Sequence, residues 1–373
     1  MRFFGMSKEM GIDLGTANTL IYIKGKGIAL REPSVVATNT ISNKVLAVGL
    51  EAKDMIGRTP ENIVAFRPLK NGVIADFDMT AQLLKSFIER VTGRNAYASS
   101  KIVIGYPLGA TDVEKRAITE AAIQTGARKV ILIEEPLAAA IGAGLPVDEP
   151  IGSMVVDIGG GTTEVAIVSL GSIVVGNSIR VAGYKLDEAI INYLKREFHL
   201  LIGERTAENI KIELGSVYED DEITNEEIVN EEIVNEEIVN KEIVNEEITN
   251  EKAINEEITR KKITNEVIGR DLLTGLPKVI TVTKAQIKDA LKDSVDLIIG
   301  IIKTTLEEVP PELAGDILDK GIMLTGGGAL LKGLDKLIYS ETHIQTYIAE
   351  FPLDCVALGA GKYLDMVDKV NDK

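Results

Sequence analysis

Two aspartates in similar short segments are the residues best suited to chemistry in this sequence. Residues 11–23 read GIDLGTANTLIYI and residues 155–167 read VVDIGGGTTEVAI, so Asp13 and Asp157 occupy the same position in two copies. In each copy an apolar run ends at the aspartate, a turn of small residues follows, and a second apolar run begins. The repeat predicts two strand–turn–strand hairpins, one from each half of a duplicated chain.

Hairpins of this composition are suited to binding polyphosphate. Small residues let consecutive backbone N–H groups approach an anion, and threonine hydroxyls add further donors. A carboxylate at the strand end is repelled by bare phosphate but suits a hydrated Mg²⁺, which keeps several of its waters. One copy alone could be an ordinary glycine turn. The aligned second copy favours a Mg–polyphosphate site that both hairpins hold, with hydroxyl donors from Thr16, Thr19, Thr162 and Thr163.

Two common nucleotide-binding signatures do not occur in the sequence. There is no G-x-x-x-x-G-K-[ST], which excludes a P-loop, and no G-x-G-x-x-G, which disfavours a dinucleotide fingerprint. A third glycine signal, LTGGGA at residues 324–329, follows an apolar run and opens a helical pattern. It predicts either a plain strand-to-helix turn or a contact with a nucleoside.

The elements that must position these hairpins follow an α/β order. The chain has 373 residues, which predicts two or three domains, and its 45% apolar and 26% charged residues are ordinary for globular proteins. Short β-branched runs alternate with helical patterns, which predicts sheets covered by helices. The expected strands include 102–104, 129–133, 154–156 and 322–324, and the expected helices include 112–125, 137–143, 187–197 and 284–308.

Composition narrows the classes of function. The formal net charge of −16 repels phosphate backbones, so we expect no nucleic-acid partner. One cysteine, Cys355, excludes an internal disulfide, and two histidines leave no Cys/His zinc cluster. No apolar stretch reaches the ~20 residues of a membrane span, and the first residues lack the pattern of a secretory signal. We therefore expect a cytoplasmic protein.

The acidity is concentrated in one repetitive segment. Residues 219–268 hold 17 acidic and 5 basic side chains, against 40 and 36 in the rest of the chain, and nine pentads of the form V/T-N-E-E-I fill residues 224–268. A period of five gives the isoleucines no constant face on a helix or a strand. We expect a low-complexity insertion, either a charged helix or a disordered arm, with no role in the core.

The hairpin pair, EPLAAA at residues 135–140 and GGGALL at residues 326–331 together resemble the actin–Hsp70–sugar kinase superfamily. The resemblance narrows to the bacterial actins of the MreB family and covers nearly the whole chain outside the acidic repeats and the extreme ends. It is carried by ten blocks in the same order: GIDLGTANTL, REPSVVA, MIGRTP, RPLKNGVIADF, IEEPLAAAIGAGLPV, GSMVVDIGGGTTEVAIVSLG, DEAIINY, GRDLLTGLP, PPELA and LTGGGALL.

The resemblance implies an actin-like ATPase fold of the α/β class, with two related domains that have RNase H-like cores around a nucleotide cleft. Each domain would carry a small outer subdomain. Domain I would cover residues 1–148, with its outer subdomain near 30–75. Domain II would cover 149–340, with an outer subdomain near 183–280 that contains the acidic insertion 219–268. Residues 341–373 would pack back on domain I.

The resemblance also implies a site for ATP and Mg²⁺. Asp13 and Asp157 would hold Mg²⁺ through water. The pair Glu208 and Lys211 could equally be a surface ion pair. The implied nucleotide-binding residues are Gly15, Thr16, Ala17 and Asn18 in the first hairpin, Gly159, Gly160 and Gly161 in the second, Glu208, Asn209, Ile210 and Lys211 on a helix toward ribose and base, and Gly326, Gly327, Gly328 and Ala329 beside the adenosine.

Glu135 occupies the position at which the superfamily places the residue that orients the attacking water, with Thr162 as its hydroxyl partner. A carboxylate can polarise water, and phosphoryl transfer depends mostly on positioning and on charge stabilisation. Glu134 is the competing candidate. A glutamate beside Pro136 could also serve only as a partner of the helix dipole.

The implied function is that of a cytoskeletal ATPase. Slow hydrolysis would be coupled to assembly of homopolymeric filaments, as paired protofilaments, at the inner face of the cell membrane. There the filaments would act with cell-shape membrane proteins to determine cell shape. The first alternative is a small-molecule kinase of the same superfold, for which we find no additional acceptor-site residues. The second is an Hsp70-like chaperone, but the about 45 residues after the third glycine signal are too few for a peptide-binding domain.

Two features depart from the family pattern. Tyr184 stands where relatives usually carry an aspartate after the glycine, so the rate of hydrolysis and its coupling to assembly could differ. The membrane signals are weak, since a few apolar side chains give only shallow, reversible binding. They consist of an N-terminal tip with Arg2, Phe3, Phe4 and Met6, and of the loop 92–100 with Tyr97.

Overall fold

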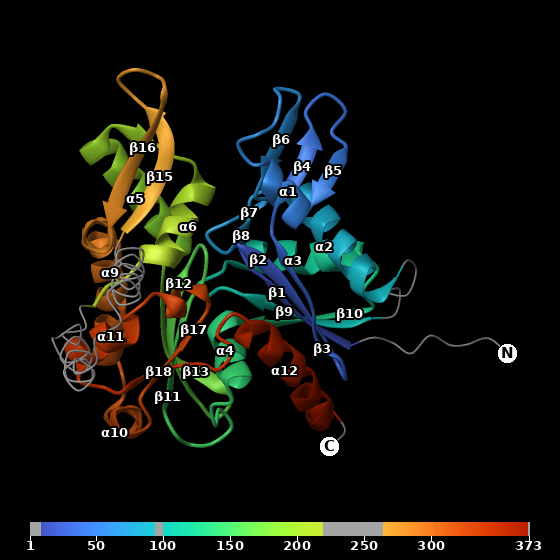
Figure 1. The fold of residues 1–373 in the computed structure, drawn as a ribbon. Helices are drawn as coiled ribbons and strands as arrows, with labels where there is room; N and C mark the ends of the chain where they lie inside the picture. Colours follow the sequence, from blue (N-terminus) through green and yellow to red (C-terminus); the bar gives the residue numbers. More distant parts are fainter. Residues whose placement is uncertain (1–8, 94–99, 219–263, 372–373) are drawn as a thin grey trace, which may run out of the picture. The chain divides into compact units, whose positions relative to one another are not determined.

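The computed structural model describes residues 9–93, 100–218 and 264–371 (Figure 1). The chain divides into two compact units. The first unit contains Met1–Leu186, Asp296–Leu330 and Ile338–Lys373, and the second contains Asp187–Val295 and Leu331–Leu337. Each expected strand and helix overlaps an observed element of the same type, with ends that agree to within two residues except at α5, which begins at Gly183, four residues before the expected start.

The first unit contains two five-stranded sheets with the same topology. The first sheet has the order β10-β9-β1-β2-β3, and the second has the order β18-β17-β11-β12-β13 when read from its opposite edge. In both sheets the central strand is antiparallel to the strand that follows it in sequence and parallel to its other neighbour. The predicted duplication is therefore confirmed at the level of strand order.

The hairpins that carry Asp13 and Asp157 lie at the centre of these sheets. The first sheet consists of β1 (Glu9–Leu14), β2 (Asn18–Ile23), β3 (Gly27–Pro33), β9 (Lys101–Tyr106) and β10 (Lys129–Glu134). The second consists of β11 (Ser153–Ile158), β12 (Thr163–Ser169), β13 (Ser172–Ile179), β17 (Ile322–Thr325) and β18 (Thr346–Ile348). All residues of β11 and β12 are buried, as expected for central strands covered on both faces.

Two helices pack closely against each other beside these sheets. In Figure 1, α4 (Glu135–Ala143) and α12 (Cys355–Asn371) lie side by side, and α12 also packs on β1. Glycine permits this approach, because a Cβ at Gly359 would lie 1.7 Å from the carbonyl oxygen of Ala138. Buried residues of the two helices belong to one hydrophobic core cluster that also includes residues of both sheets, among them Val103 and Val155.

The rest of the first unit adds further helices and short strands to this centre. A long helix, α2, buries Leu83, Leu84 and Phe87 against the first sheet. The elements are α1 (Leu50–Met55), α2 (Phe77–Thr92), α3 (Asp112–Gln124), α10 (Pro311–Lys320), β4 (Val36–Asn39), β5 (Val45–Val48), β6 (Ile63–Phe66), β7 (Leu69–Lys70), β8 (Val73–Ile74) and the 3₁₀ helix η1 (Gly327–Leu330).

The second unit is built on a three-stranded sheet, β14-β15-β16, with α6 beside it. Helices α5, α9 and α11 each run from one unit into the other. The elements are α5 (Gly183–Phe198), β14 (Leu200–Leu201), α6 (Glu204–Leu214), β15 (Thr264–Asp271), β16 (Pro277–Thr283), α9 (Lys284–Glu307) and α11 (Leu334–Thr342).

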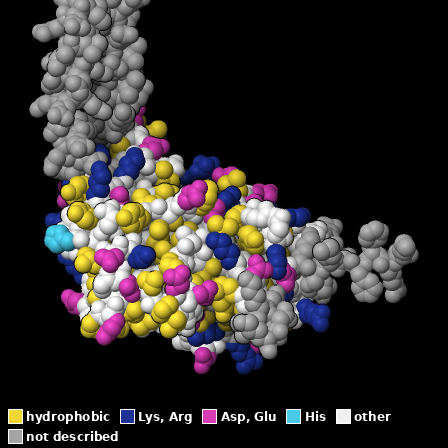
Figure 2. Space-filling view, turned by 90° about the horizontal axis from the view of Figure 1, so that it is seen from below, with side chains coloured by type: hydrophobic (Ala, Val, Ile, Leu, Met, Phe, Trp, Pro, Cys, Tyr) yellow, Lys and Arg dark blue, Asp and Glu magenta, His cyan; other side chains and the backbone are white. Residues whose placement is uncertain are grey.

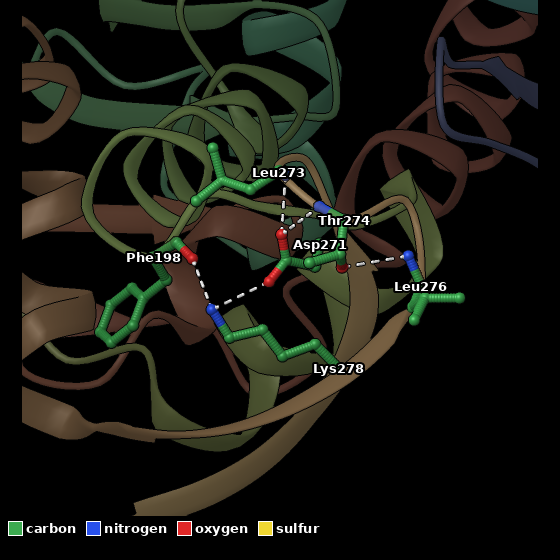
Figure 3. Close-up of polar contacts among 6 residues, drawn as sticks. All are labelled: Phe198, Asp271, Leu273, Thr274, Leu276 and Lys278. Atoms are coloured by element: carbon green, nitrogen blue, oxygen red, sulfur yellow. Dashed lines mark hydrogen bonds and ion pairs between the residues drawn. The ribbon is translucent and has the colours of Figure 1, made fainter.

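The turn between β15 and β16 is organised by one aspartate (Figure 3). The Asp271 carboxylate accepts hydrogen bonds from the backbone N–H groups of Leu273, at 2.7 Å, and Thr274, at 3.1 Å. The Lys278 ammonium lies 3.4 Å from its other oxygen and donates to the Phe198 carbonyl at 3.2 Å. The backbone hydrogen bonds lower the pKa of Asp271, so the turn is held by a carboxylate that is ionised at neutral pH.

The last pentad of the acidic repeat differs from our expectation. Residues 264–268 form the start of β15, and Val267 is 2% exposed in the core of the second unit. The prediction that the repeats have no core role is therefore wrong for this pentad. Its physical reason is the sequence TNEVI, in which Val267 replaces the second acidic residue of the V/T-N-E-E-I pattern. The earlier pentads lie outside the described residues.

Most of the expected membrane signals lie outside the described residues. The N-terminal tip at residues 2–6 and Tyr97 of the loop 92–100 lie outside the described residues. Within the described ranges, none of the helices combines the length and the apolar character that crossing a bilayer requires.

Candidate functional site

The turns of the two repeated hairpins lie against each other in the first unit. A Cβ at Gly160 would be 2.6 Å from the Cβ of Ala17, and a Cβ at Gly161 would be 2.8 Å from the Thr16 hydroxyl oxygen. Such distances are too short for any side chain, so glycine is required for this approach. The structure thus brings the small residues of the first turn together with those of the second.

Asp13 and Asp157 end the central strands of the two sheets, beside these turns. The surrounding protein desolvates both carboxyl groups. Desolvation and the charge of Asp157 raise the pKa of Asp13 to about 8. Desolvation also raises the pKa of Asp157 to about 6, although the Thr325 hydroxyl donates a hydrogen bond to it at 2.8 Å. Two desolvated carboxylates, of which Asp157 acts on Asp13 through its charge, fit a hydrated divalent cation, so these residues suit Mg²⁺.

Glu135 belongs to the same cluster of carboxylates. It is the first residue of α4, it is 8% exposed, and Pro136 follows it. Its pKa is raised well above the ordinary value by burial and by the charges of Glu164, Asp13 and Asp157, in that order. The end of β10 and the start of α4 therefore place this side chain where it interacts with both strand-end aspartates.

Glu134, the competing candidate, has a different partner. Its carboxylate accepts a hydrogen bond at 2.5 Å from the hydroxyl of Tyr106, the last residue of β9. That contact holds Glu134 between neighbouring ends of β9 and β10, which pair in register at these residues. The geometry therefore favours Glu135 as the member of the carboxylate cluster.

Sequence reasoning missed Glu164, a fourth carboxylate of the cluster. It is fully buried on β12, directly opposite Asp157 on β11. One oxygen accepts hydrogen bonds from the backbone N–H of Leu108, at 2.9 Å, and from the hydroxyl of Ser178, at 3.4 Å. The other oxygen is buried and accepts none from the described residues. A charged residue inside the otherwise uncharged strand TEVAIVS is the signal that would have indicated it.

Thr162 and the third glycine signal also lie in the first unit. The Thr162 side chain is 9% exposed and follows the glycines of the second turn. Gly326 has a φ of +76°, and a Cβ there would lie 2.4 Å from the Ile158 carbonyl oxygen. A Cβ at Gly328 would lie 2.1 Å from the Ile158 side chain. The residues 326–329 are therefore packed against the end of β11, next to the second turn.

The remaining expected nucleotide contacts are in the second unit. Glu208, Asn209, Ile210 and Lys211 lie on α6, where Ile210 is buried. The Lys211 ammonium forms an ion pair at 2.7 Å with Asp187, which is also largely buried. The structure thus gives Lys211 an acidic partner on α5, and the roles expected for these four residues toward ribose and base stay predictions.

Comparison with known proteins identifies the family of the chain. The family model described as MreB/Mbl protein matches residues 7–265 and 251–372. The chain is 48% identical over 364 residues to the cell shape-determining protein Mbl of Bacillus subtilis, covering 98% of both chains. It is also 48% identical over 373 residues to the cell shape-determining protein MreB of Escherichia coli, covering 98% of this chain and 96% of that one.

Solved structures show the same fold. MreB5 of Spiroplasma citri bound to AMPPNP matches with a TM-score of 0.83 and 34% identity, covering 98% of each chain. The MamK double helical filament matches with a TM-score of 0.71 and 20% identity, covering 96% of this chain and 99% of that chain, which supports the actin-like fold alone. The family match, the close relatives and the paired hairpins together show that this chain belongs to the MreB/Mbl family.

Proposed function

We propose that this chain is a cytoskeletal ATPase that determines cell shape. Its relatives in Bacillus subtilis and Escherichia coli are cell shape-determining proteins, and the related MreB5 structures hold AMPPNP and ADP. The observation that carries the proposal is the meeting of two matched turns, with Asp13 and Asp157 beside them. The small-molecule kinase alternative has no support from these relatives.

The hairpins supply the phosphate-binding groups of the proposed site. Backbone N–H groups of residues 15–18, 160 and 161 would donate to the phosphate oxygens, as expected for turns of small residues, while the Gly159 N–H closes the second turn on the Thr162 carbonyl at 2.9 Å. Asp13 and Asp157 would hold Mg²⁺ through water, and the bound ion would neutralise part of the triphosphate charge. Residues 326–329 would lie on the adenosine side, and Glu208–Lys211 would contact ribose and base.

Glu135 is the residue that we propose for orienting the attacking water, with the Thr162 hydroxyl as its partner. In its ionised form, a carboxylate whose pKa is raised above its ordinary range is a stronger base toward water. Burial and three neighbouring carboxylates provide that shift for Glu135. Slow hydrolysis coupled to assembly would follow if these groups reach their working geometry only when subunits associate.

We further infer that copies of this chain assemble into filaments at the inner face of the cell membrane, together with cell-shape membrane proteins. Support for assembly comes from the shape-determining role of the relatives. Support for membrane contact comes from the apolar residues of the N-terminal tip and the loop 92–100.

The decisive experiment measures nucleotide binding and assembly together. Purified protein is titrated with a fluorescent ATP analogue at several Mg²⁺ concentrations, and the same samples are imaged by electron microscopy. We expect micromolar or tighter binding and filaments that require Mg–ATP. The double variant Asp13→Asn/Asp157→Asn should lose most of the Mg²⁺-dependent affinity, whereas Asp319→Asn on the exposed face of α10 should keep it. Absence of nucleotide affinity in the unaltered protein, or full affinity in the double variant, would refute the proposal.

A further inference from the structure

Tyr184, which stands where relatives usually carry an aspartate, contacts the turns of both repeated hairpins. These two turns, at residues 15–18 and 159–161, are called the phosphate turns below. Its backbone N–H donates to the Gly160 carbonyl at 2.9 Å, and the preceding Gly183 N–H donates to the Gly159 carbonyl at 3.1 Å. At the far end of the side chain, the Tyr184 hydroxyl donates to the Thr16 carbonyl at 3.4 Å. One residue at the start of α5 therefore connects the second turn, through its backbone, with the first turn, through its ring.

The guanidinium group of Arg67 lies over the ring of Tyr184. The distance from the Arg67 Cζ to the ring centroid is 4.4 Å, which is well within the range of a cation–π contact. Neither phosphate turn contains a lysine or an arginine. Arg67 thus brings a positive charge to a residue that bridges the two turns.

Arg67 also begins a segment whose other end touches both turns. The Gly72 N–H donates to the Thr16 hydroxyl oxygen at 2.8 Å. A Cβ at Gly161 would lie 2.9 Å from the Cα of Asn71, so this backbone packs directly on the second turn. Residues 67–72 are therefore fixed at one end by the arginine–tyrosine contact and at the other end by the turns themselves.

We propose that Arg67 and Tyr184 form a clasp that holds residues 67–72 across the two turns and slows the release of bound nucleotide. The proposal rests on the proposed function, because it assumes that both turns grip the phosphates of one nucleotide. Separation of the turns breaks the ring–guanidinium contact and the hydrogen bond to Thr16. The clasp therefore opposes the motion that dissociation requires. Both residues act through the turns, as positioning residues.

The test measures the dissociation of a fluorescent ADP. The complex of the full-length protein with the labelled ADP and Mg²⁺ is mixed rapidly with excess unlabelled ADP. A cation–π contact of ordinary strength corresponds to a roughly 3- to 30-fold change in rate. We expect Arg67→Met and Tyr184→Leu each to accelerate dissociation within that range and to leave the association rate within about twofold. Tyr184→Phe keeps the ring under Arg67 but loses the hydroxyl that donates to the Thr16 carbonyl, so it should accelerate dissociation less than Tyr184→Leu does.

A double-mutant cycle separates the clasp from two independent effects. The Arg67→Met/Tyr184→Leu variant should release nucleotide no faster than the faster single variant, because both changes break one contact. Rates that multiply, or single variants with unaltered dissociation, would overturn the clasp. If Tyr184→Leu does not fold, the dissociation rates of Arg67→Lys and Arg67→Met are compared instead. Lysine retains a cation over the ring, so Arg67→Lys should release the labelled ADP more slowly than Arg67→Met. Equal rates for these two variants would overturn the clasp. An unaltered protein that binds no nucleotide would refute the proposed function instead.

Discussion

Single residues in the carboxylate cluster differ sharply in environment even where they are adjacent in sequence. Glu134 accepts a hydrogen bond from Tyr106, whereas Glu135 is buried among acidic neighbours. Desolvation and the charges of its acidic neighbours raise the pKa of Glu135, whereas the hydroxyl of Tyr106 occupies the carboxylate of Glu134. The two glutamates therefore have different chemical capacities, and the difference arises from the strand end and helix start that hold them.

This difference predicts unequal effects of the same substitution. Glu135→Gln should slow phosphate release at saturating ATP by at least several-fold and change the ATP affinity by less than about twofold, because the side chain would act on the attacking water. Glu134→Gln, the matched control, should keep most of the rate. The measurement is single-turnover phosphate release together with equilibrium binding. Equal rates for the Glu135 variant and the unaltered protein would contradict the assignment.

Glu164 predicts a pH dependence of stability. Burial and the charge of Asp157 raise its pKa to about 8 in the folded state. Glu164 therefore favours the folded state only while it is protonated. Its contribution to the free energy of unfolding is fully present below the unfolded-state pKa of about 4.3 and is lost as the pH rises through about 8. Glutamine cannot ionise, so Glu164→Gln should raise the Tm of the nucleotide-free protein by a few degrees at pH 8.5 and have a smaller effect at pH 5.5.

Thermal unfolding curves from pH 5.5 to 8.5 at constant ionic strength provide the measurement. The exposed Glu61 is the matched control, because Glu61→Gln should leave the pH dependence of the Tm unchanged. A Glu164→Gln variant whose Tm runs parallel to that of the unaltered protein across this range would show that Glu164 is ionised in the folded state.

At the scale of elements, the contact between α4 and α12 depends on two glycines. A Cβ at Gly142 would lie 1.8 Å from the backbone oxygen of Cys355, and a Cβ at Gly359 would lie 1.7 Å from that of Ala138. Backbone atoms cannot move aside as a flexible side chain can. The two helices therefore have to separate if either glycine gains a methyl group.

Alanine at either glycine should consequently be severely destabilising. We expect Gly142→Ala and Gly359→Ala each to lower the free energy of unfolding by about 3 kcal/mol or more, at the upper end of overpacking effects. Gly300→Ala in α9 is the matched control, because a Cβ there meets no atom within 4 Å. It should stabilise by about 0.5–1 kcal/mol through helix propensity. Urea denaturation compares the three variants, and equal midpoints would disprove the packing argument.

The elements also show how far sequence reasoning reached. The hairpins around Asp13 and Asp157 were predictable because alternating apolar runs and small-residue turns are local signals. The packing of Gly160 on Ala17 depends on how the two sheets meet, and no local pattern encodes that contact. Glu164 was missed for the same reason, since its role follows from its neighbours across the sheet. Val267 was misjudged because the repeat pattern was extended over the last pentad, in which a valine replaces the second acidic residue.

At the scale of the whole molecule, charge is distributed unevenly along the chain. Outside residues 219–268 the acidic and basic side chains number 40 and 36, which is nearly balanced. On the face shown in Figure 2, the described residues accordingly present lysine, arginine, aspartate and glutamate interspersed with hydrophobic side chains. The acidic repeats thus supply most of the net charge of −16.

This distribution predicts that the repeats oppose lateral association of the proposed filaments. Glutamine at the twelve glutamates from Glu226 to Glu257 changes the formal net charge from −16 to −4 and preserves the length of the segment. Because like charges repel and salt screens them over about 10 Å at 0.1 M, the neutralised variant should bundle more strongly at low salt. The difference should shrink toward 1 M salt, where the screening length is about 3 Å.

Sedimentation at low speed, which collects bundles, and at high speed, which collects all filaments, provides the comparison across a salt series. A control variant with twelve glutamates replaced by aspartates at the same positions keeps the charge and should behave as the unaltered protein does. Increased bundling of the glutamine variant alone would assign the effect to charge. Equal bundling of all three proteins at every salt concentration would show that the repeats do not regulate lateral contacts, because a change of twelve charges is too large to leave an electrostatic barrier intact.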